Sequence, residues 1–402
     1  MWCQFVSIES DMDERERVMS LRVGLMMIIL LAGTARPQRP ELAATPPLGW
    51  NTWYAFGCQV TEANVRAVVD AMVSNGMKAS GYEYVSLDDC WQGERDSEGR
   101  IQSNNRFPDM KALGDYIHSR GFKYGIYSSP GLKTCGGYAG SYGHEQEDAE
   151  TYANWGVDFL KYDWCSAGQV YKPSQIEAAY EKMHQAILMT GRPMIYSLCE
   201  YGVAAPWTWG PKIGANLWRT TDDVSNKIDF QEYARMMFVG FGQEGLQHFA
   251  GPGHWNDPDF LQIGNRGLDL NEDKTQISLW SLLAAPLFSS TDVTKLTEAQ
   301  LAILTNPEVM AVDQDPKGIQ GRRLSQMGPV QVWAKPLSRG RTAVGLINSG
   351  ESPFTASVNF RDIGYSNHVL VRDLWERKDL GEFRNSYTTM VPKHGVVLIE
   401  IH

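Results

Sequence analysis

The segment Gly156-Val157-Asp158-Phe159-Leu160-Lys161-Tyr162-Asp163-Trp164-Cys165 runs from an apolar β pattern directly into a lysine, an aspartate and a cysteine. In a barrel of parallel strands, the carboxyl ends of the strands form the face that binds substrates. Charged side chains at the end of a β pattern therefore mark a candidate active face. An aspartate after a strand can also cap the next helix, so this segment alone leaves both interpretations open.

Four further apolar runs end in the same way. They lead into Asp88-Asp89, Cys199-Glu200-Tyr201, Asp222-Asp223 and Asn256-Asp257-Pro258-Asp259. Helix capping does not require so many acidic residues. Carboxylates accept hydrogen bonds from hydroxyls, and the faces of tryptophan and tyrosine cover the apolar side of a sugar ring. The repeated pattern predicts a pocket for a neutral, polyhydroxylated ligand.

Strand and helix patterns alternate from about residue 48 to residue 310. Strands are expected at 48–53, 83–87, 123–127, 157–162, 194–198, 217–220, 249–250 and 284–287, and helices at 62–74, 110–120, 145–155 and 173–190. Eight βα units in about 260 residues are typical of a (β/α)8 TIM barrel. The alternative, a doubly wound open sheet, gives no reason for motifs at nearly every strand end.

The pattern changes after Asp315-Pro316-Lys317-Gly318. Short alternating runs follow at 330–334, 342–347, 355–360, 368–375 and 395–401, and turn residues separate them. Such runs predict an antiparallel β-sandwich. We therefore expect a catalytic barrel over 46–313 and a C-terminal antiparallel β domain over 318–402, giving an α/β protein with two domains.

The amino terminus has the pattern of an export signal. An apolar run at 23–32 follows Arg22 and precedes Gly33-Thr34-Ala35, as in a secretory signal peptide. This run is too short to span a bilayer, so no membrane attachment is expected after cleavage. We expect a signal peptide within 1–35 with its true start at Met19, because the acidic segment before Met19 is unlike a signal, and a linker over 36–45. The protein is then secreted or periplasmic.

The net charge and the cysteine content further restrict the functional class of the protein. The net charge is −10, and an acidic chain is a poor partner for nucleic acid. The cysteines lack the spacing of a zinc site, so we expect no metal. In an exported protein, disulfides are expected instead. Cys58 and Cys90 follow the first two strand ends, Cys135 and Cys165 follow the next two, and Cys199 is left over.

Seven motifs, read in order, resemble the α-galactosidases (melibiases) of glycoside hydrolase family 27. They are Leu48-Gly49-Trp50-Asn51-Thr52-Trp53, Asp88-Asp89-Cys90-Trp91, Gly125-Ile126-Tyr127, Lys161-Tyr162-Asp163, Cys199-Glu200-Tyr201-Gly202, Trp218-Arg219-Thr220-Thr221 and Gly251-Pro252-Gly253-His254-Trp255-Asn256-Asp257-Pro258-Asp259. The resemblance extends from about residue 45 to the C-terminus. It implies a barrel with a C-terminal β domain, no cofactor or metal, and retaining hydrolysis of terminal α-galactosides in oligosaccharides or polysaccharides.

The resemblance also implies roles for individual residues. Asp163 corresponds to the nucleophile, and Asp223 to the acid/base, because the acid/base of the family lies four residues after the arginine; this choice excludes the neighbouring Asp222. Sugar-contacting positions fall on Trp53, Asp88, Asp89, Tyr127, Lys161, Cys199, Glu200, Tyr201, Arg219 and Asp259. Disulfides of the family match Cys58 with Cys90 and Cys135 with Cys165. Tyr201 replaces a tryptophan that many plant and fungal members have.

The chemistry agrees with these roles. A retaining glycosidase needs one ionised and one protonated carboxyl group about 5 to 5.5 Å apart. Lys161 lies two residues before Asp163 on the same strand, so it points to the same side and favours the ionised form of Asp163. Two enzyme alternatives of the same fold remain open, a β-L-arabinopyranosidase and an α-N-acetylgalactosaminidase. A non-catalytic carbohydrate-binding protein is disfavoured, because such a protein does not need an acid/base pair.

Overall fold

A computed structural model describes residues 42–225, 232–265, 267–366 and 368–402. The predicted signal peptide, the start at Met19 and most of the predicted linker lie outside the described residues. Within the described ranges, no helix combines the length and the apolar character that a membrane crossing requires.

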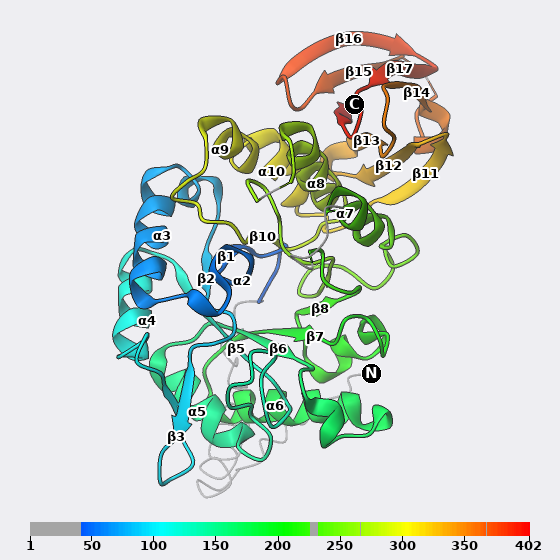
Figure 1. Ribbon diagram of the computed structural model, residues 1–402. Helices are drawn as coiled ribbons and strands as arrows, with labels where there is room; N and C mark the ends of the chain where they lie inside the picture. Colours follow the sequence, from blue (N-terminus) through cyan, green and yellow to red (C-terminus); the bar gives the residue numbers. More distant parts are fainter. Residues whose placement is uncertain (1–41, 226–231, 266, 367) are drawn as a thin grey trace, which may run out of the picture. The chain divides into compact units, whose positions relative to one another are not determined.

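Eight parallel strands form the central sheet, in the order β10-β1-β2-β5-β6-β7-β8-β9 (Figure 1). The strands are β1 (Leu48–Asn51), β2 (Tyr84–Ser86), β5 (Lys123–Ser128), β6 (Phe159–Asp163), β7 (Ile195–Cys199), β8 (Leu217–Arg219), β9 (Trp255–Asp257) and β10 (Leu287–Ser289). A parallel bridge between Leu261, just beyond β9, and Ser289 of β10 joins the two edges of the sheet. The predicted TIM barrel is confirmed.

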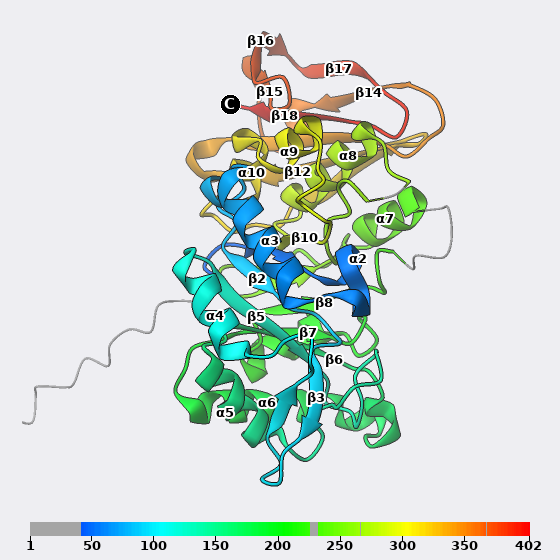
Figure 2. The same cartoon turned by 60° about the vertical axis from the view of Figure 1, so that its left-hand side comes forward.

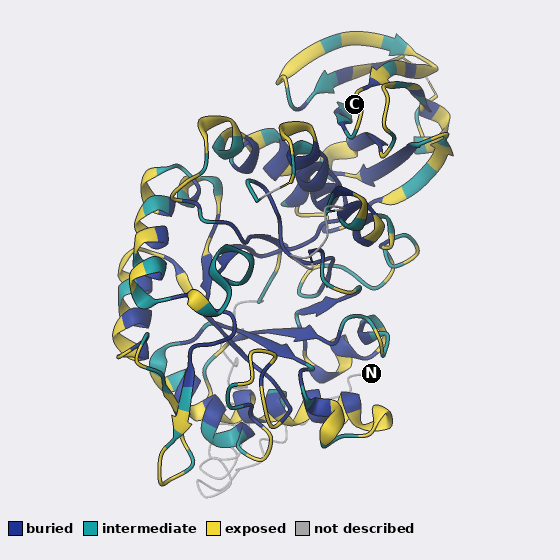
Figure 3. Ribbon diagram, in the orientation of Figure 1, coloured by how far each residue is buried: buried dark blue, intermediate teal, exposed yellow. Residues whose placement is uncertain are grey.

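Helices surround the strands on the outside of the barrel. They are α3 (Glu62–Ser74), α4 (Met110–Ser119), α5 (Glu145–Trp155), α6 (Ile176–Thr190), α7 (Glu232–Phe241), α8 (Leu270–Leu282), α9 (Glu298–Leu304) and α10 (Pro307–Asp313). The short helix α2 (Trp53–Phe56) instead directly follows β1 at the carboxyl ends of the strands. Helix α3 shows why they form: Thr61 and Asn64 make a capping box, and Val65, Val68, Val69 and Met72 bury one face. Figure 3 shows buried strands inside and exposed residues on the outer helix faces.

Two predicted strands are displaced in the structure. The strand expected at 249–250 begins only at Trp255, because Gly251 and His254 form a turn bridge around Gly253, whose φ is 89°. The strand expected at 284–287 begins at Leu287, since Ala284 has a left-handed φ of 51° and Pro286 has no N–H to donate.

The alternation of strands and helices also fails at one connection. Between β7 and β8 the chain forms only the 3-10 turns Pro206–Thr208 and Gly210–Ile213. Pro206 begins the first segment, and Pro211 has no N–H with which to continue that segment into a longer helix. A short hairpin, β3 (Gln92–Arg95) with β4 (Ile101–Ser103), lies between β2 and α4.

The C-terminal part forms antiparallel sheets. One has the order β11-β12-β13-β18-β15-β16, and the other pairs β14 with β17. The strands are β11 (Arg322–Met327), β12 (Val330–Pro336), β13 (Thr342–Asn348), β14 (Phe354–Asn359), β15 (His368–Asp373), β16 (Lys378–Arg384), β17 (Ser386–Val391) and β18 (Val396–Ile401). The sequence did not predict β11, β16 and β17. Strands β11 and β16 are the two edges of their sheet, where polar residues replace the apolar alternation.

The C-terminal sheets pack against α8 of the barrel (Figure 2). The ring of Trp333 on β12 stacks on Phe241 of α7, with 6.2 Å between the ring centroids. A side chain at Gly345 of β13 would place its Cβ 2.5 Å from Leu282, so glycine permits the close approach of this strand to α8. The buried Lys335 donates to the carbonyls of Ser281 and Asp313 at 2.9 and 3.2 Å.

Candidate active site

A cavity of about 110 Å³ opens at the carboxyl ends of the barrel strands. Its walls include ten of the predicted site residues, namely Trp53, Asp88, Asp89, Tyr127, Lys161, Asp163, Tyr201, Arg219, Asp223 and Asp259. Three further lining residues, Tyr54, Cys135 and Phe260, were not predicted to contact a ligand. Consecutive parallel strands therefore do bring their terminal charges to one place, as the repeated motif suggested.

Two predicted binding residues, Cys199 and Glu200, do not line this cavity. Cys199 is a buried thiol whose Sγ lies 3.7 Å from Arg219 Nη1. Glu200 turns back into its own loop, where its Oε2 accepts a hydrogen bond from the amide of Ala204 at 2.7 Å. Burial raises the pKa of Glu200 to about 7. Both residues support the loop after β7 rather than the surface that a ligand meets.

Lys161 lies between two carboxylates. Its Nζ is 2.8 Å from Asp88 Oδ2 and 4.0 Å from Asp163 Oδ2. Lys161 and Asp163 share the inner side of β6, as their spacing predicted, whereas Tyr162 packs on Tyr180 of α6. The closer partner of the ammonium group is Asp88, in the loop after β2.

Burial dominates the ionisation of Asp163. It raises the pKa of this carboxyl to about 6, and the charge of Lys161 and a hydrogen bond from Tyr201 offset only part of the rise. The lysine thus acts in the predicted direction, but burial is the larger effect. At neutral pH the Asp163 carboxylate is ionised.

The adjacent acids Asp88 and Asp89 are each stabilised by separate donors. Asp88 Oδ2 also accepts a hydrogen bond from Asn51 Nδ2 at 2.9 Å. Asp89 accepts backbone hydrogen bonds from Cys90 at 2.6 Å and from Gly136 at 2.5 Å. Asp88 therefore lies beside a cation, whereas Asp89 is held by amides.

On the opposite wall, Arg219 joins two further carboxylates. Its Nη2 lies 3.1 Å from Asp223 Oδ1 and 3.3 Å from Asp259 Oδ2. Tyr54 donates a hydrogen bond of 2.8 Å to Asp259 Oδ2. The Asp259 side chain is 1% exposed and that of Asp223 is 41% exposed, so only Asp223 reaches towards solvent. Burial raises the pKa of Asp223, and the charge of Arg219 opposes the rise.

The structure separates Asp223 from its neighbour Asp222. The Asp222 side chain is 73% exposed and forms an ion pair of 2.9 Å with Arg235, outside the cavity. The local residue pattern does not distinguish the two, because adjacent residues at the end of a strand have similar surroundings along the chain; only the family resemblance selected Asp223.

Disulfides join neighbouring loops at the cavity. Cys58 is bonded to Cys90 and Cys135 to Cys165, while Cys199 has a free thiol. Atoms of Cys135, Asp163 and Cys165 lie within 4.8 Å of one another. Because the two cysteines are oxidised, they do not offer thiolates to a metal ion.

Sequence reasoning missed Asn51, Tyr54 and Phe260. Asn51 ends β1 and holds Asp88, and Phe260 lies 5.1 Å from the ammonium group of Lys161. Asn51 and Phe260 each adjoin or belong to a quoted motif, so their positions were visible in the sequence. What the sequence did not show was the direction of each side chain.

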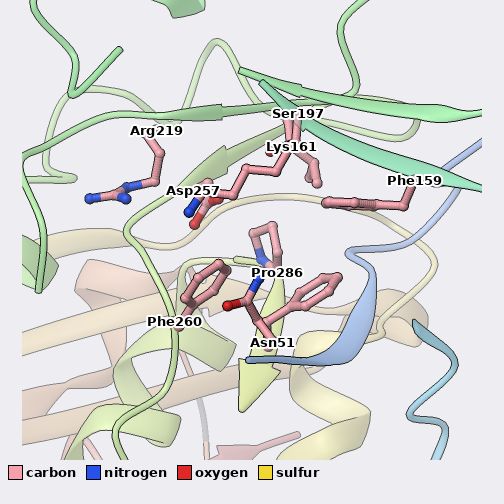
Figure 4. A pocket seen from close by; sticks show the side chains of 10 residues that line it. Asn51, Phe159, Lys161, Ser197, Arg219, Asp257, Phe260 and Pro286 are labelled. Atoms are coloured by element: carbon pink, nitrogen blue, oxygen red, sulfur yellow. The ribbon is translucent and has the colours of Figure 1, made fainter. Parts of the chain in front are cut away.

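Beneath the cavity, the barrel interior is nearly filled. Figure 4 shows Lys161, Arg219 and Asp257 across from Phe260 and Pro286, with Phe159 beside Lys161. The void between them measures only about 10 Å³, close to the minimum for one water molecule. Burial raises the pKa of Asp257 to about 6, and the charge of Arg219 opposes the rise. A void of this size does not admit a sugar ring, so the barrel interior next to the cavity is closed to such a ligand.

Comparison with known proteins agrees with this arrangement. The sequence profile described as "Alpha galactosidase A" matches residues 45–315, and that of the "Alpha galactosidase C-terminal beta sandwich domain" matches residues 327–401. The chain belongs to the α-galactosidase (melibiase) family. It is therefore a glycoside hydrolase, and its C-terminal sheets are the β-sandwich of this family.

Individual members of the α-galactosidase family match over most of the chain. Alpha-galactosidase A of Cellvibrio japonicus is 41% identical over 95% of this chain and 98% of its own length. The crystal structure of alpha-galactosidase I from Mortierella vinacea is 37% identical, with a TM-score of 0.83 over 90% of this chain and 97% of that one. The structure of the Saccharomyces cerevisiae α-galactosidase with raffinose is 28% identical, with a TM-score of 0.83 over 90% and 98%.

Proposed function

We propose that this enzyme hydrolyses terminal α-D-galactosyl residues with retention of configuration, with Asp163 as the nucleophile and Asp223 as the acid/base. The observation that carries the proposal is the contrast between the two carboxyl groups in one cavity. Asp163 is buried beside Lys161 and Tyr201, whereas Asp223 is partly exposed beside Arg219. Retaining glycosidases need two carboxyl groups with different protonation states.

The reaction then has two steps. First, ionised Asp163 attacks the anomeric carbon, while protonated Asp223 gives its proton to the departing glycosidic oxygen. Next, Asp223 takes a proton from water, the water oxygen bonds to the anomeric carbon, and Asp163 leaves as a carboxylate. The partial exposure of Asp223 supports a role on the side from which the leaving group departs and water enters.

The cavity fits the end of a sugar chain rather than its middle. The closed floor admits one terminal residue, so the proposed action is of the exo type. Asp88 and Asp89 present acceptors for sugar hydroxyls, and Trp53 offers an aromatic face. The relative from Saccharomyces cerevisiae was solved with raffinose. Together with the family relatives, this supports galactoside oligosaccharides as substrates and favours galactose over the two alternative sugars.

The disulfides support a place of action outside the cytoplasm. Stable disulfides form in oxidising compartments, and this structure has two beside the cavity. We propose a secreted or periplasmic enzyme. Mass analysis of the exported protein tests this point, with an amino terminus near Arg36 as the expected result; retention of Met1 or Met19 contradicts it.

The substrate is tested with a panel of 4-nitrophenyl glycosides. The α-D-galactopyranoside should have the highest kcat/KM, above the β-L-arabinopyranoside and the α-N-acetylgalactosaminide. NMR should show that the first product is α-galactose. A higher kcat/KM for either other sugar overturns the substrate assignment, and β-galactose as the first product overturns retention.

Variants test the two roles separately. Asp163→Ala should abolish turnover, and azide should restore it with inverted configuration. Asp223→Ala should keep much of its glycosylation rate with activated leaving groups, which need little protonation, while slow deglycosylation lets the intermediate accumulate. A fluorinated galactosyl inactivator should label Asp163. Labelling of Asp222, Asp223 or Asp259 contradicts the assignment.

A further inference from the structure

We propose that Tyr201 is a positioning residue for the reaction, because its phenol hydroxyl holds one oxygen of Asp163 and leaves the other oxygen to attack the anomeric carbon. The hydroxyl donates to Asp163 Oδ1 over 2.7 Å. Lys161 Nζ, the nearby cation, is 4.0 Å from Oδ2, which exceeds a hydrogen-bond distance. This inference rests on the proposed function of Asp163 and adds a residue that acts through it.

The backbone sets Tyr201 in place before any ligand arrives. Tyr201 has a left-handed φ of 62°, which is uncommon for a residue with a bulky side chain. The next residue, Gly202, has a φ of 76°, and a Cβ there would lie 2.2 Å from the carbonyl oxygen of Thr220. Glu200 accepts from Ala204 and closes the same turn. Such strained positions persist where the surroundings determine them strongly.

The ring of Tyr201 is enclosed from two sides. Its hydroxyl lies 3.6 Å from Cys135 Sγ and 3.7 Å from Cys165 Sγ, against the disulfide. The guanidinium of Arg219 lies 5.9 Å from the ring centroid. The phenol therefore has little freedom to leave Asp163. Burial, and next the charge of Asp163, raise the pKa of Tyr201, so the hydroxyl keeps its proton and remains a donor.

The hydrogen bond affects both steps of the reaction. In the first step, the bond from Asp163 Oδ2 to the anomeric carbon forms as the bond to the glycosidic oxygen breaks. Oδ1 then becomes the carbonyl oxygen of the glycosyl ester and still accepts from Tyr201. In the second step, the ester bond breaks and Asp163 regains its charge. A hydrogen bond to a carboxylate is stronger than one to a neutral carbonyl, so Tyr201 favours the departure of Asp163.

Several other groups also act on the ionisation of Asp163, and the hydroxyl of Tyr201 is one contribution among them. The groups that face Asp163 from the neighbouring elements are Lys161 on its own strand, Asp88 after β2, Tyr127 on β5, Tyr180 on α6, Cys199 on β7 and Asp223 after β8. Arg219 of β8 lines the same cavity. A variant that removes only the hydroxyl leaves these groups unchanged.

The experiment compares Tyr201→Phe with Tyr162→Phe. Tyr162 is the residue before Asp163 and is fully buried, whereas Tyr201 is half-buried. Among the described residues the Tyr162 hydroxyl has no hydrogen-bond partner, and its ring packs on Tyr180. The pH dependence of kcat/KM is measured with 4-nitrophenyl α-D-galactopyranoside, and pre-steady-state kinetics are recorded with the same substrate. Thermal unfolding checks that both variants fold.

We expect Tyr201→Phe to move the acidic limb of the kcat/KM profile upward by roughly one pH unit, the shift that a lost hydrogen bond to a charged group predicts. It should also lower kcat about 10-fold by slowing deglycosylation, so that a burst of 4-nitrophenol precedes the steady state. Tyr162→Phe should leave both the limb and kcat unchanged.

The outcomes separate this inference from the proposed function. If the fluorinated inactivator labels a residue other than Asp163 in the unmutated enzyme, the proposed nucleophile is wrong. If it labels Asp163 but Tyr201→Phe lowers kcat/KM by the same factor at every pH, without moving the acidic limb, Tyr201 only fills space and the inference is overturned. A shifted limb in Tyr162→Phe also overturns it.

Discussion

The mouth of the barrel and the core of the C-terminal sandwich are built on opposite principles. At the mouth, Asp88, Lys161, Asp163, Arg219 and Asp259 are all buried, each less than 10% exposed. The buried cluster of the sandwich consists of apolar side chains such as Val332, Leu346 and Ile399, together with Tyr387. Burying charge is costly unless partners compensate. The buried charges of the site therefore lower the free energy of unfolding, and apolar burial in the rest of the fold must offset this cost.

The junction between the barrel and the sandwich contains both apolar packing and buried charge. Trp333 belongs to the sandwich strand β12 but packs within the large core of the barrel. Beside it, burial lowers the pKa of Lys335 to about 8, and burial raises that of Asp313 to about 7. The apolar contacts there bind the two domains, while the lysine satisfies carbonyls at the ends of α8 and α10.

The sharpest test of the comparison exchanges a buried charge for a neutral isostere. Asp163→Asn should reduce kcat by roughly 10⁴-fold or more, as loss of a nucleophile does. The same variant should be more stable than the unmutated protein at pH 7. Urea unfolding and steady-state kinetics on one preparation measure both effects.

The stability gain should depend on pH. The pKa of Asp163 is about 6 in the folded protein, above the ordinary value of 3.8 for an aspartate, so its contribution to stability is present below about pH 4 and lost as the pH rises to about 6. An asparagine side chain does not titrate, so the Asp163→Asn variant does not lose this contribution as the pH rises. The advantage of the variant should therefore grow between pH 4 and 6, to roughly 1 to 3 kcal/mol, and then level off. A variant that is less stable at pH 7 contradicts the comparison.

A variant at the junction of barrel and sandwich should lose stability and keep its activity, the reverse of Asp163→Asn. Trp333→Ala removes a fully buried side chain from the core and should cost about 3 to 5 kcal/mol of unfolding free energy. Because Trp333 does not line the cavity, kcat/KM per folded molecule should stay unchanged at a temperature where the variant is folded. Denaturant unfolding and active-site titration with the inactivator measure the two quantities. A loss of kcat/KM without a loss of stability would show that the junction controls the site.

Removal of either disulfide should have an effect of intermediate size, and the two double variants can be compared directly. They close loops of 32 and 30 residues, so replacing either pair by serine should cost about the same free energy, roughly 2 to 4 kcal/mol. Only Cys135 and Cys165 contact the hydroxyl of Tyr201. The Cys135→Ser/Cys165→Ser variant should therefore lose more kcat than Cys58→Ser/Cys90→Ser. Equal losses of kcat would mean that the disulfide beside Tyr201 serves stability alone.

The smallest effect is expected on the sandwich surface. Leu370 on β15 is 50% exposed, and Leu370→Thr keeps a residue suited to a strand. Unfolding free energy should change by no more than about 0.5 kcal/mol, and activity should not change. A larger loss, measured by urea unfolding, would indicate that this face is covered in the native protein.

Most barrel strands, the order of their acidic ends and the change to antiparallel structure after residue 315 could be predicted from the sequence alone. Local patterns suffice for these features, because a strand buried on both faces is apolar throughout and ends abruptly at its charges. The unpredicted edge strands β11 and β16 lack that signal, since solvent covers one side of each.

Only the tertiary structure decided which groups meet. The ammonium group of Lys161 lies on Asp88, 73 residues away, rather than on its neighbour Asp163. The hydroxyl that does reach Asp163 comes from Tyr201, 38 residues further along. Asp222 and Asp223 differ because one side chain faces Arg235 and the other Arg219. These choices depend on side-chain directions that are set by packing between distant strands, and no local pattern of residues contains that information.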